Sequence, residues 1–152
     1  MTVADPRPQI VELLGFDEAG GRRRRTIASG AVVSIRDFLV LSDENTAAIH
    51  TTTPLSVCAG LADEQKKGDG EDFTTRITAV TEAIIDAYAS GAIRVGQPLA
   101  LSDVANFVQG AVTGQSTSAA AIRLASGAEI IGYSEAAASD QEQFRMHFKI
   151  GG

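Results

Sequence analysis

The sequence is poor in the residues that most often build metal and redox centres. Among its 152 residues it has one cysteine, two histidines and no tryptophan. A single cysteine, Cys58, excludes a disulfide within the chain and a zinc site made of several thiolates. Its neighbours Val57, Ala59 and Leu61 are small or apolar, so we expect Cys58 to be a buried side chain that packs like a small hydrophobic residue.

The two histidines and the few acidic clusters do not form a recognisable centre. His50 and His147 are far apart, and neither has a second ligand at the spacing that metals require. His147 alternates with Met146 and Phe148, so we expect it on a solvent or interface side of a strand. Asp69, Glu71 and Asp72 could form a calcium site or a solvated loop, and the loop is favoured because the regular ligand order is missing. We therefore predict no bound metal.

Enzyme motifs are also missing. There is no Gly-x-Ser-x-Gly nucleophile elbow, and Gly20-Gly21 precedes arginines instead of the Gly-Lys-Ser/Thr of a phosphate-binding loop. We expect no cofactor, no catalytic residue and no enzymatic activity.

Positive charge and long apolar runs are scarce as well. Lysine and arginine number 13 against 19 acidic residues, for a net charge of −6, which argues against nucleic acid as a partner. No stretch approaches the roughly 20 apolar residues that span a bilayer, and the first residues do not resemble a signal peptide. We expect a soluble protein that is made in a cytoplasm and does not bind membranes.

Glycines and short apolar runs are plentiful, and together they predict the fold class. Fifteen glycines separate runs rich in Val, Ile, Leu and Ala, which is typical of short strands joined by tight turns. We predict a mainly β fold, a small β-barrel or sandwich, with one short helix near the C-terminus. Residues 1–9, with Pro6 and Pro8, are expected to form an extended N-terminal arm. Residues 10–152 are expected to form a single β-rich domain, and no repeat of fixed period is evident.

Four local expectations follow from the pattern. Thr74–Ala89 fits a helical stripe and a strand alternation about equally well. Ser134–Gln141 is expected to be the short helix, capped by Ser134. Gly60, inside an apolar run, suggests a bulge or a close backbone approach. A hairpin from Ile10–Phe16 to Arg22–Ile27 would place the arginines near Glu12, Asp17 and Glu18.

Arg22, Arg23, Arg24 and Arg25 are the one concentration of positive charge. Three interpretations stand: an exposed strand offset by nearby acidic residues, a docking site for an acidic protein surface, or contact with nucleic acid. The last is the weakest because no aromatic residues lie between the arginines.

Between Gly30 and Ile150 the chain resembles the small capsid decoration, or cement, proteins of tailed viruses such as bacteriophages. The segments that carry the resemblance are Gly30–Val33, Val57–Ala62, Ser90–Leu99 and Ile131–Ala137. The resemblance implies strand for much of Thr74–Ala89 and a short helix after Ile131-Gly132. It also implies a structural virion protein on the outer surface of the capsid. Its partners would be the major capsid protein and, in a homotrimer, itself.

The expected contacts with the shell or between subunits are exposed polar segments that have no other evident role. They are Thr2, Pro6, Arg7 and Pro8 of the arm Thr2–Gln9, the arginines Arg22, Arg23, Arg24 and Arg25, and the threonines Thr51, Thr52 and Thr53. Two alternatives stand beside decoration: another head or tail assembly protein, and a small β-barrel ligand-binding domain or enzyme.

Overall fold

The computed structural model describes residues 4–14, 21–28, 30–42, 46–51, 57–67, 76–111 and 130–150. Within these ranges the chain forms eleven strands and no helix. The strands are β1 (Gln9–Leu13), β2 (Arg22–Ile27), β3 (Phe38–Leu41), β4 (Thr46–Ile49), β5 (Cys58–Ala62), β6 (Arg76–Val80), β7 (Glu82–Ala89), β8 (Pro98–Leu101), β9 (Phe107–Gly110), β10 (Gly132–Ser134) and β11 (Gln143–Lys149). The expected mainly β, barrel-type fold is therefore confirmed.

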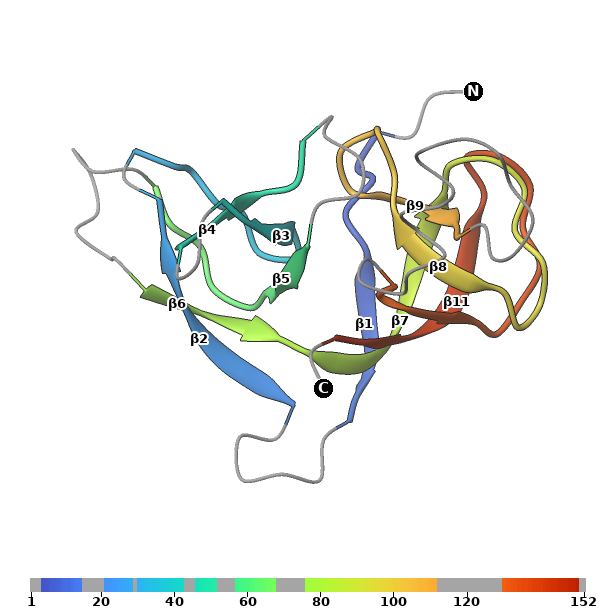
Figure 1. Cartoon of the computed structure of the whole chain (residues 1–152), viewed down its shortest axis with the longest axis horizontal. Helices are drawn as coiled ribbons and strands as arrows, with labels where there is room; N and C mark the ends of the chain where they lie inside the picture. Colours follow the sequence, from blue (N-terminus) through green and yellow to red (C-terminus); the bar gives the residue numbers. More distant parts are fainter. Residues whose placement is uncertain are drawn as a thin grey trace.

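The strands form two barrels that lie side by side (Figure 1). The first is closed in the order β2-β4-β3-β5-β6. The second sheet has the order β1-β7-β11-β10-β8-β9, and a parallel pairing of β7 with β9 closes its last five strands. Strand β1 lies outside this closure and pairs only with β7. Only Thr81 separates β6 from β7, so these strands carry the chain directly from one barrel to the other.

The two barrels have the same connectivity. Strands β2 to β6 correspond in order to β7 to β11, and in both barrels the first strand pairs parallel with the third and antiparallel with the fifth. The backbone hydrogen bonds repeat as well: Val33 and Lys66 exchange bonds in the first barrel as Ile93 and Ala138 do in the second. The chain therefore contains a structural duplication, although no sequence repeat of fixed period is evident.

The duplication extends to a matching tight turn in each barrel. Residues 34–37 and 94–97 each form a turn in which the last N–H donates to the first carbonyl, and the third residue, Arg36 or Gly96, has a φ of 76°. This is the geometry of a type II turn. In both turns the last side chain, Asp37 or Gln97, accepts a bond from the backbone N–H of the first residue.

The ambiguous stretch Thr74–Ala89 forms strand at every described residue except Thr81. Residues 82–89 alternate between half-buried and buried without interruption, with Ala83, Ile85, Ala87 and Ala89 facing the core. This is the period of two that a strand with one covered face requires. The strand interpretation is thus confirmed for β6 and β7.

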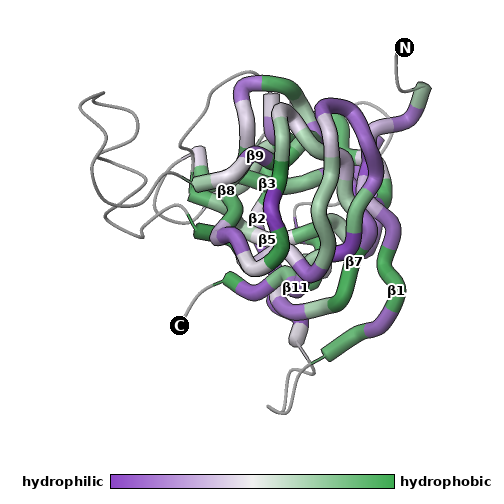
Figure 2. The backbone as a smooth tube through the Cα atoms, turned by 90° about the vertical axis from the view of Figure 1, so that its right-hand side faces the viewer, coloured by the Kyte–Doolittle hydropathy of each residue, from purple (hydrophilic) through white to green (hydrophobic). Residues whose placement is uncertain are grey.

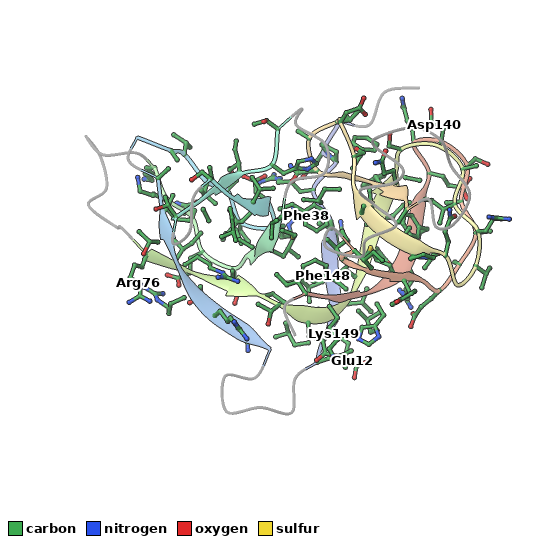
Figure 3. All side chains as sticks on the ribbon, in the orientation of Figure 1. Glu12, Phe38, Arg76, Asp140, Phe148 and Lys149 are labelled. Atoms are coloured by element: carbon green, nitrogen blue, oxygen red, sulfur yellow. The ribbon has the colours of Figure 1, made fainter. Side chains whose placement is uncertain are left out.

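The barrels share part of their core. One cluster of buried side chains contains Phe38, Cys58 and Leu61 of the first barrel together with most of the buried side chains of the second. The rings of Phe38 and Phe148 meet between the barrels at a centroid distance of 5.8 Å (Figure 3). A second cluster, which includes Ile77 and Leu39, fills the first barrel alone.

Two local expectations are wrong. Ser134–Gln141 is not a helix: Ser134 ends β10, Ala138 bridges to Ile93, and a turn follows at 139–142. These residues satisfy their backbone groups through a neighbouring segment, which local capping signals do not reveal.

The expected hairpin of Ile10–Phe16 with Arg22–Ile27 does not form either. β1 pairs with β7, and β2 pairs with β6 and β4. The arginines therefore face acidic residues after β5 instead of Glu12. Asp17 and Glu18 lie outside the described residues.

Candidate interaction surface

The N-terminal arm lies on the first barrel. Arg36, the third residue of the 34–37 turn, donates from Nη1 to the carbonyls of Pro8 (3.1 Å) and Arg7 (3.4 Å) and from Nη2 to Asp5 Oδ2 (3.3 Å). Arg7 in turn donates to the carbonyl of Ile35 at 3.4 Å. The arm and the turn are thereby held together by two guanidinium groups, one from the turn that donates to the arm and one from the arm that donates to the turn.

Within the arm, Asp5 and Arg7 form a second restraint. The Arg7 guanidinium donates to both oxygens of Asp5 at 2.9 and 3.1 Å, and these hydrogen bonds lower the pKa of Asp5 to about 2. Asp5 therefore carries its negative charge throughout the ordinary pH range. Pro6 lies between the two residues and limits the backbone conformations of the arm.

Strand β1 continues the arm along the second barrel. It pairs antiparallel with β7 from Gln9 opposite Asp86 to Leu13 opposite Ala83, with an irregularity between Ile10 and Glu12. Hydrophilic and hydrophobic stretches follow one another along it (Figure 2), with Ile10 and Val11 between Gln9 and Glu12. Ile10 packs against the core, whereas Val11 and Leu13 are 45% and 40% exposed. Residues 4–13 therefore tie a turn of the first barrel to a strand of the second.

The arginines Arg22–Arg25 lie on β2, opposite β6. Arg22 Nε contacts Asp63 Oδ2 at 3.2 Å. Arg24 Nη1 contacts Glu64 Oε1 at 2.6 Å and donates to Thr78 Oγ1 at 3.0 Å. Hydrogen bonds from Thr78, and the nearby Arg24, lower the pKa of Glu64. Half of the cluster is thus neutralised by exposed ion pairs.

Arg23 and Arg25 lie on the other face of β2. Arg25 Nε donates to the carbonyl of Ala59 at 2.9 Å, and burial of its guanidinium lowers its pKa. Arg23 is exposed and has no ion-pair partner among the residues that the structure describes. The cluster therefore has one face paired with carboxylates and one face that keeps its positive charge.

The remaining predicted contacts are only partly described. Thr51 is exposed and follows β4. Thr2, Thr52 and Thr53 lie outside the described residues. The arm, the arginines and Thr51 come from different elements, and the bonds described above bring together only the arm and the 34–37 turn.

The two matching turns also present apolar side chains that sequence reasoning did not select. Ile35 is 46% exposed and Val95 is 69% exposed, and they occupy the same position in their turns. Tyr133, on β10, is 55% exposed. The sequence carries a signal for this match, because Leu-x-Leu-Ser-Asp occurs at 39–43 and 99–103, and Ser-Gly-Ala precedes each turn at 29–31 and 90–92.

One open depression lies between β7, β11 and the segment after β10, with a volume of about 440 Å³. It is lined by Asp86, Glu135, Ala136, Gln143, Phe144 and Arg145. Arg145 Nε contacts Asp86 Oδ1 across it at 3.0 Å, and this bond raises the pKa of Arg145. The two charges cancel, and the described residues that line the depression include no histidine, cysteine or serine.

His50 belongs to a buried polar network between the barrels. The backbone N–H of Asn106 donates to His50 Nδ1 at 3.1 Å, and His50 Nε2 contacts the carbonyl of Ser102 at 2.8 Å. Asn106 also donates to Asp37 and accepts from the N–H of Phe38. Burial lowers the pKa of His50, so the ring is neutral and its role is structural.

Further candidate chemistry is limited. His147 contacts Glu82 on the surface at 3.1 Å. Burial raises the pKa of Cys58 to about 12, which makes its thiol a poor nucleophile, as expected of a packed side chain. Over the described ranges, no group of three or more His, Cys, Asp or Glu side chains is placed to hold a metal ion. The same ranges contain no helix long and apolar enough to cross a membrane.

A scan against protein-family models found no matching family, and a search of curated proteins found no matching relative.

Proposed function

We propose that this chain is a capsid decoration protein that binds the assembled shell of a tailed virus. It binds the major capsid protein on the outer surface, as homotrimers, and stabilises the shell without catalysis. The observation that supports this best is the preformed surface in which Arg36 holds the arm residues Asp5, Arg7 and Pro8 against the turn that exposes Ile35.

Preorganisation gives this surface a physical advantage. A polar arm that was free in solution would lose conformational entropy on binding, whereas an arm already held by guanidinium bonds loses less. The surface combines charged groups with an exposed apolar side chain, as protein interfaces commonly do. A stable interface of this kind buries about 1,600 Å² in total.

Stabilisation of the shell then follows from linkage. A protein that binds only the assembled state raises the stability of that state by mass action. A trimer that contacts several shell subunits at once gains further affinity through effective concentration. Neither effect requires a reacting group.

The test is co-sedimentation of the purified chain with expanded shells of the virus that encodes it, followed by thermal disassembly of the shells. We expect stoichiometric binding and a higher disassembly temperature. The absence of co-sedimentation under all salt conditions would overturn the proposal.

Matched variants locate the surface. Ile35→Glu and Val95→Glu alter equivalent exposed turn positions in the two barrels, so their effects on folding should be similar. We expect Ile35→Glu to weaken shell binding about tenfold, as loss of a central contact does, and Val95→Glu to bind as the parent chain does. Equal effects of the two variants would show that the surface formed by the arm and the Ile35 turn is not the one that binds the shell.

Removal of residues 1–8 should weaken shell binding and preserve both barrels, because β1 begins at Gln9.

The trimer is tested by sedimentation equilibrium of the free chain and by its copy number on shells. Single copies in solution and on shells would contradict it.

A further inference from the structure

The duplication contains two equivalent strand edges, of which only the one in the second barrel is covered by an additional strand. In the second barrel, β9 pairs with β7 only at Tyr88 and Ala89, and β1 covers the same edge of β7 from Ala83 to Asp86. In the first barrel, β4 pairs with β2 only at Thr26 and Ile27. No described strand pairs with Arg22–Arg25 on the side opposite β6.

The two edges correspond residue by residue. Thr26 matches Tyr88, because each begins the parallel pairing with the third strand of its barrel. Counting back, Arg24 matches Asp86 and Arg23 matches Ile85, which are the residues opposite Gln9 and Ile10 of β1. The edge of β2 at Arg22–Arg25, called here the β2 edge, is thus the counterpart of the edge that β1 occupies (Figure 1).

We infer that the β2 edge binds an extended acidic segment of a partner protein by strand addition, in the geometry that β1 adopts on β7. Main-chain hydrogen bonds supply affinity in this mode, and side chains on alternate positions supply specificity. The inference rests on the proposed function only for the source of the strand, which would be the shell protein.

Charge identifies the chemistry of the partner strand. Asp63 and Glu64 already pair with Arg22 and Arg24, so one face of the edge is neutralised. Arg23 lies on the other face, exposed, at the position where Ile85 is buried in the second barrel. A strand added there places one side chain directly opposite Arg23, where a carboxylate is favoured and a cation is repelled.

The same arginines explain why the edge does not pair indiscriminately. Exposed strand edges invite association with other strands, and charged side chains oppose it. Arg23, which keeps its positive charge, disfavours a basic strand, while an acidic strand removes the repulsion. The charge therefore selects the partner as well as protecting the edge.

The experiment uses three fluorescent peptides with the sequence of residues 5–14: the native one, one with Ile10→Glu and one with Ile10→Lys. Position 10 is the one that faces Arg23 when the peptide binds as β1 does. The chain's own β1 is tethered beside β7 at a high effective concentration, so the added peptide should not displace it. Binding to the full chain is followed by fluorescence anisotropy.

We expect the Ile10→Glu peptide to bind at least tenfold more tightly than the Ile10→Lys peptide. Arg23→Glu in the protein should reverse this order, and Arg94→Glu, an exposed arginine of the second barrel, should leave it unchanged. N-methylation of the peptide amides at even or at odd positions distinguishes strand addition from simple charge attraction. In an added strand only every second N–H donates to the neighbouring strand, so the two methylation patterns, or phases, should differ. One of the two methylation phases should abolish binding, and the other should have little effect.

Three results would overturn the inference: no binding of the acidic peptide, equal affinity for the acidic and basic peptides, or equal effects of both methylation phases. Self-association that Arg23→Glu abolishes would also overturn it, because the edge would then bind a second copy of the chain. Shell co-sedimentation is a separate measurement. If the chain binds the acidic peptide but does not bind shells, the inference about the β2 edge stands and the proposed function is wrong.

Discussion

At the residue scale, Gly60 and Gly132 occupy equivalent positions in the two barrels and cannot carry a side chain. Gly60 has a φ of 130°, and a Cβ there would lie 2.8 Å from Ala79 Cβ and 2.9 Å from the carbonyl oxygen of Val80. A Cβ at Gly132 would overlap the carbonyl of His147. Both glycines therefore permit close contact between adjacent strands.

We expect Gly60→Ala or Gly132→Ala to lower the free energy of unfolding by about 3 kcal/mol, because strain and overlap act together. Gly91→Ala is the matched control: its φ is 84°, but no atom lies within 4 Å of the added Cβ. It should cost only about 1 kcal/mol. Urea denaturation followed by circular dichroism measures all three, and equal losses would contradict the role of close packing.

Sequence reasoning reached some of these residues and missed others for identifiable reasons. Gly60 was predicted to mark a bulge or a close approach, and both are present, since the register with β3 shifts beside it. Arg36 was not selected, although it has the same positive φ as Gly96. An arginine in the sequence does not indicate a positive φ. The bonds from Arg36 to the arm offset the strain, and they connect residues about 28 positions apart.

At the scale of elements, local periodicity predicted strands better than it predicted their partners. The alternation of residues 82–89 is a property of the strand itself, so the sequence alone shows it. The strand that the resemblance implied for this stretch, in place of a helix, is the one observed. The pairing of β1 with β7 joins residues 70 or more positions apart, and turn composition favoured a nearer partner. The expected helix failed similarly, because a distant bridge to Ile93 decides its backbone.

The arm offers a test of how one side chain orders an element. Arg36→Gly removes the guanidinium bonds to Asp5, Arg7 and Pro8 but relieves the positive φ, so we expect overall stability to change by less than about 1 kcal/mol. The ¹⁵N heteronuclear NOE of Asp5 and Arg7 should fall to values typical of a flexible chain. Arg94→Ala, in the equivalent region of the second barrel, is the control. An arm that stays rigid in Arg36→Gly would show that Arg36 does not hold it.

At the scale of the whole molecule, the repeat was hidden because the halves share only short identical strings and one insertion offsets them. Ser-Gly-Ala at 29–31 and 90–92 differ by 61 positions, whereas Leu-x-Leu-Ser-Asp at 39–43 and 99–103 differ by 60. Structure makes the duplication plain through equivalent pairings. Among the described residues, Asn106 of the second barrel bonds to Asp37 and Phe38 of the first, and such pairs lie too far apart in the sequence for a local pattern to predict them.

The network between the barrels predicts a dependence of stability on pH. Neutral His50 accepts at Nδ1 from the Asn106 N–H and donates at Nε2 to Ser102, and protonation of Nδ1 would break the first bond. Burial lowers the folded-state pKa below the ordinary value of 6.5. Between these two pKa values the unfolded chain binds more protons, so the free energy of unfolding should fall as pH drops below about 6.5.

Urea denaturation at about pH 7.5 and about pH 5.5 measures this effect in the parent chain and in His50→Leu. The variant should be less stable at the higher pH but should lose less stability on acidification. His147→Gln controls for the other histidine, which contacts Glu82 on the surface. A parent chain equally stable at both pH values would contradict the assignment of a neutral His50.

The shared core predicts that the two barrels unfold together. Phe148 is fully buried and meets Phe38 of the other barrel, while Ile77 is fully buried in the cluster of the first barrel alone. Alanine at either position should cost about 3–5 kcal/mol, and both variants should lower the temperature of one common transition. In differential scanning calorimetry the ratio of calorimetric to van 't Hoff enthalpy should stay near one. If the barrels unfolded independently, Ile77→Ala would split the transition into two. The second barrel would keep its original unfolding temperature, because no shared contact would transmit the loss of stability from the first.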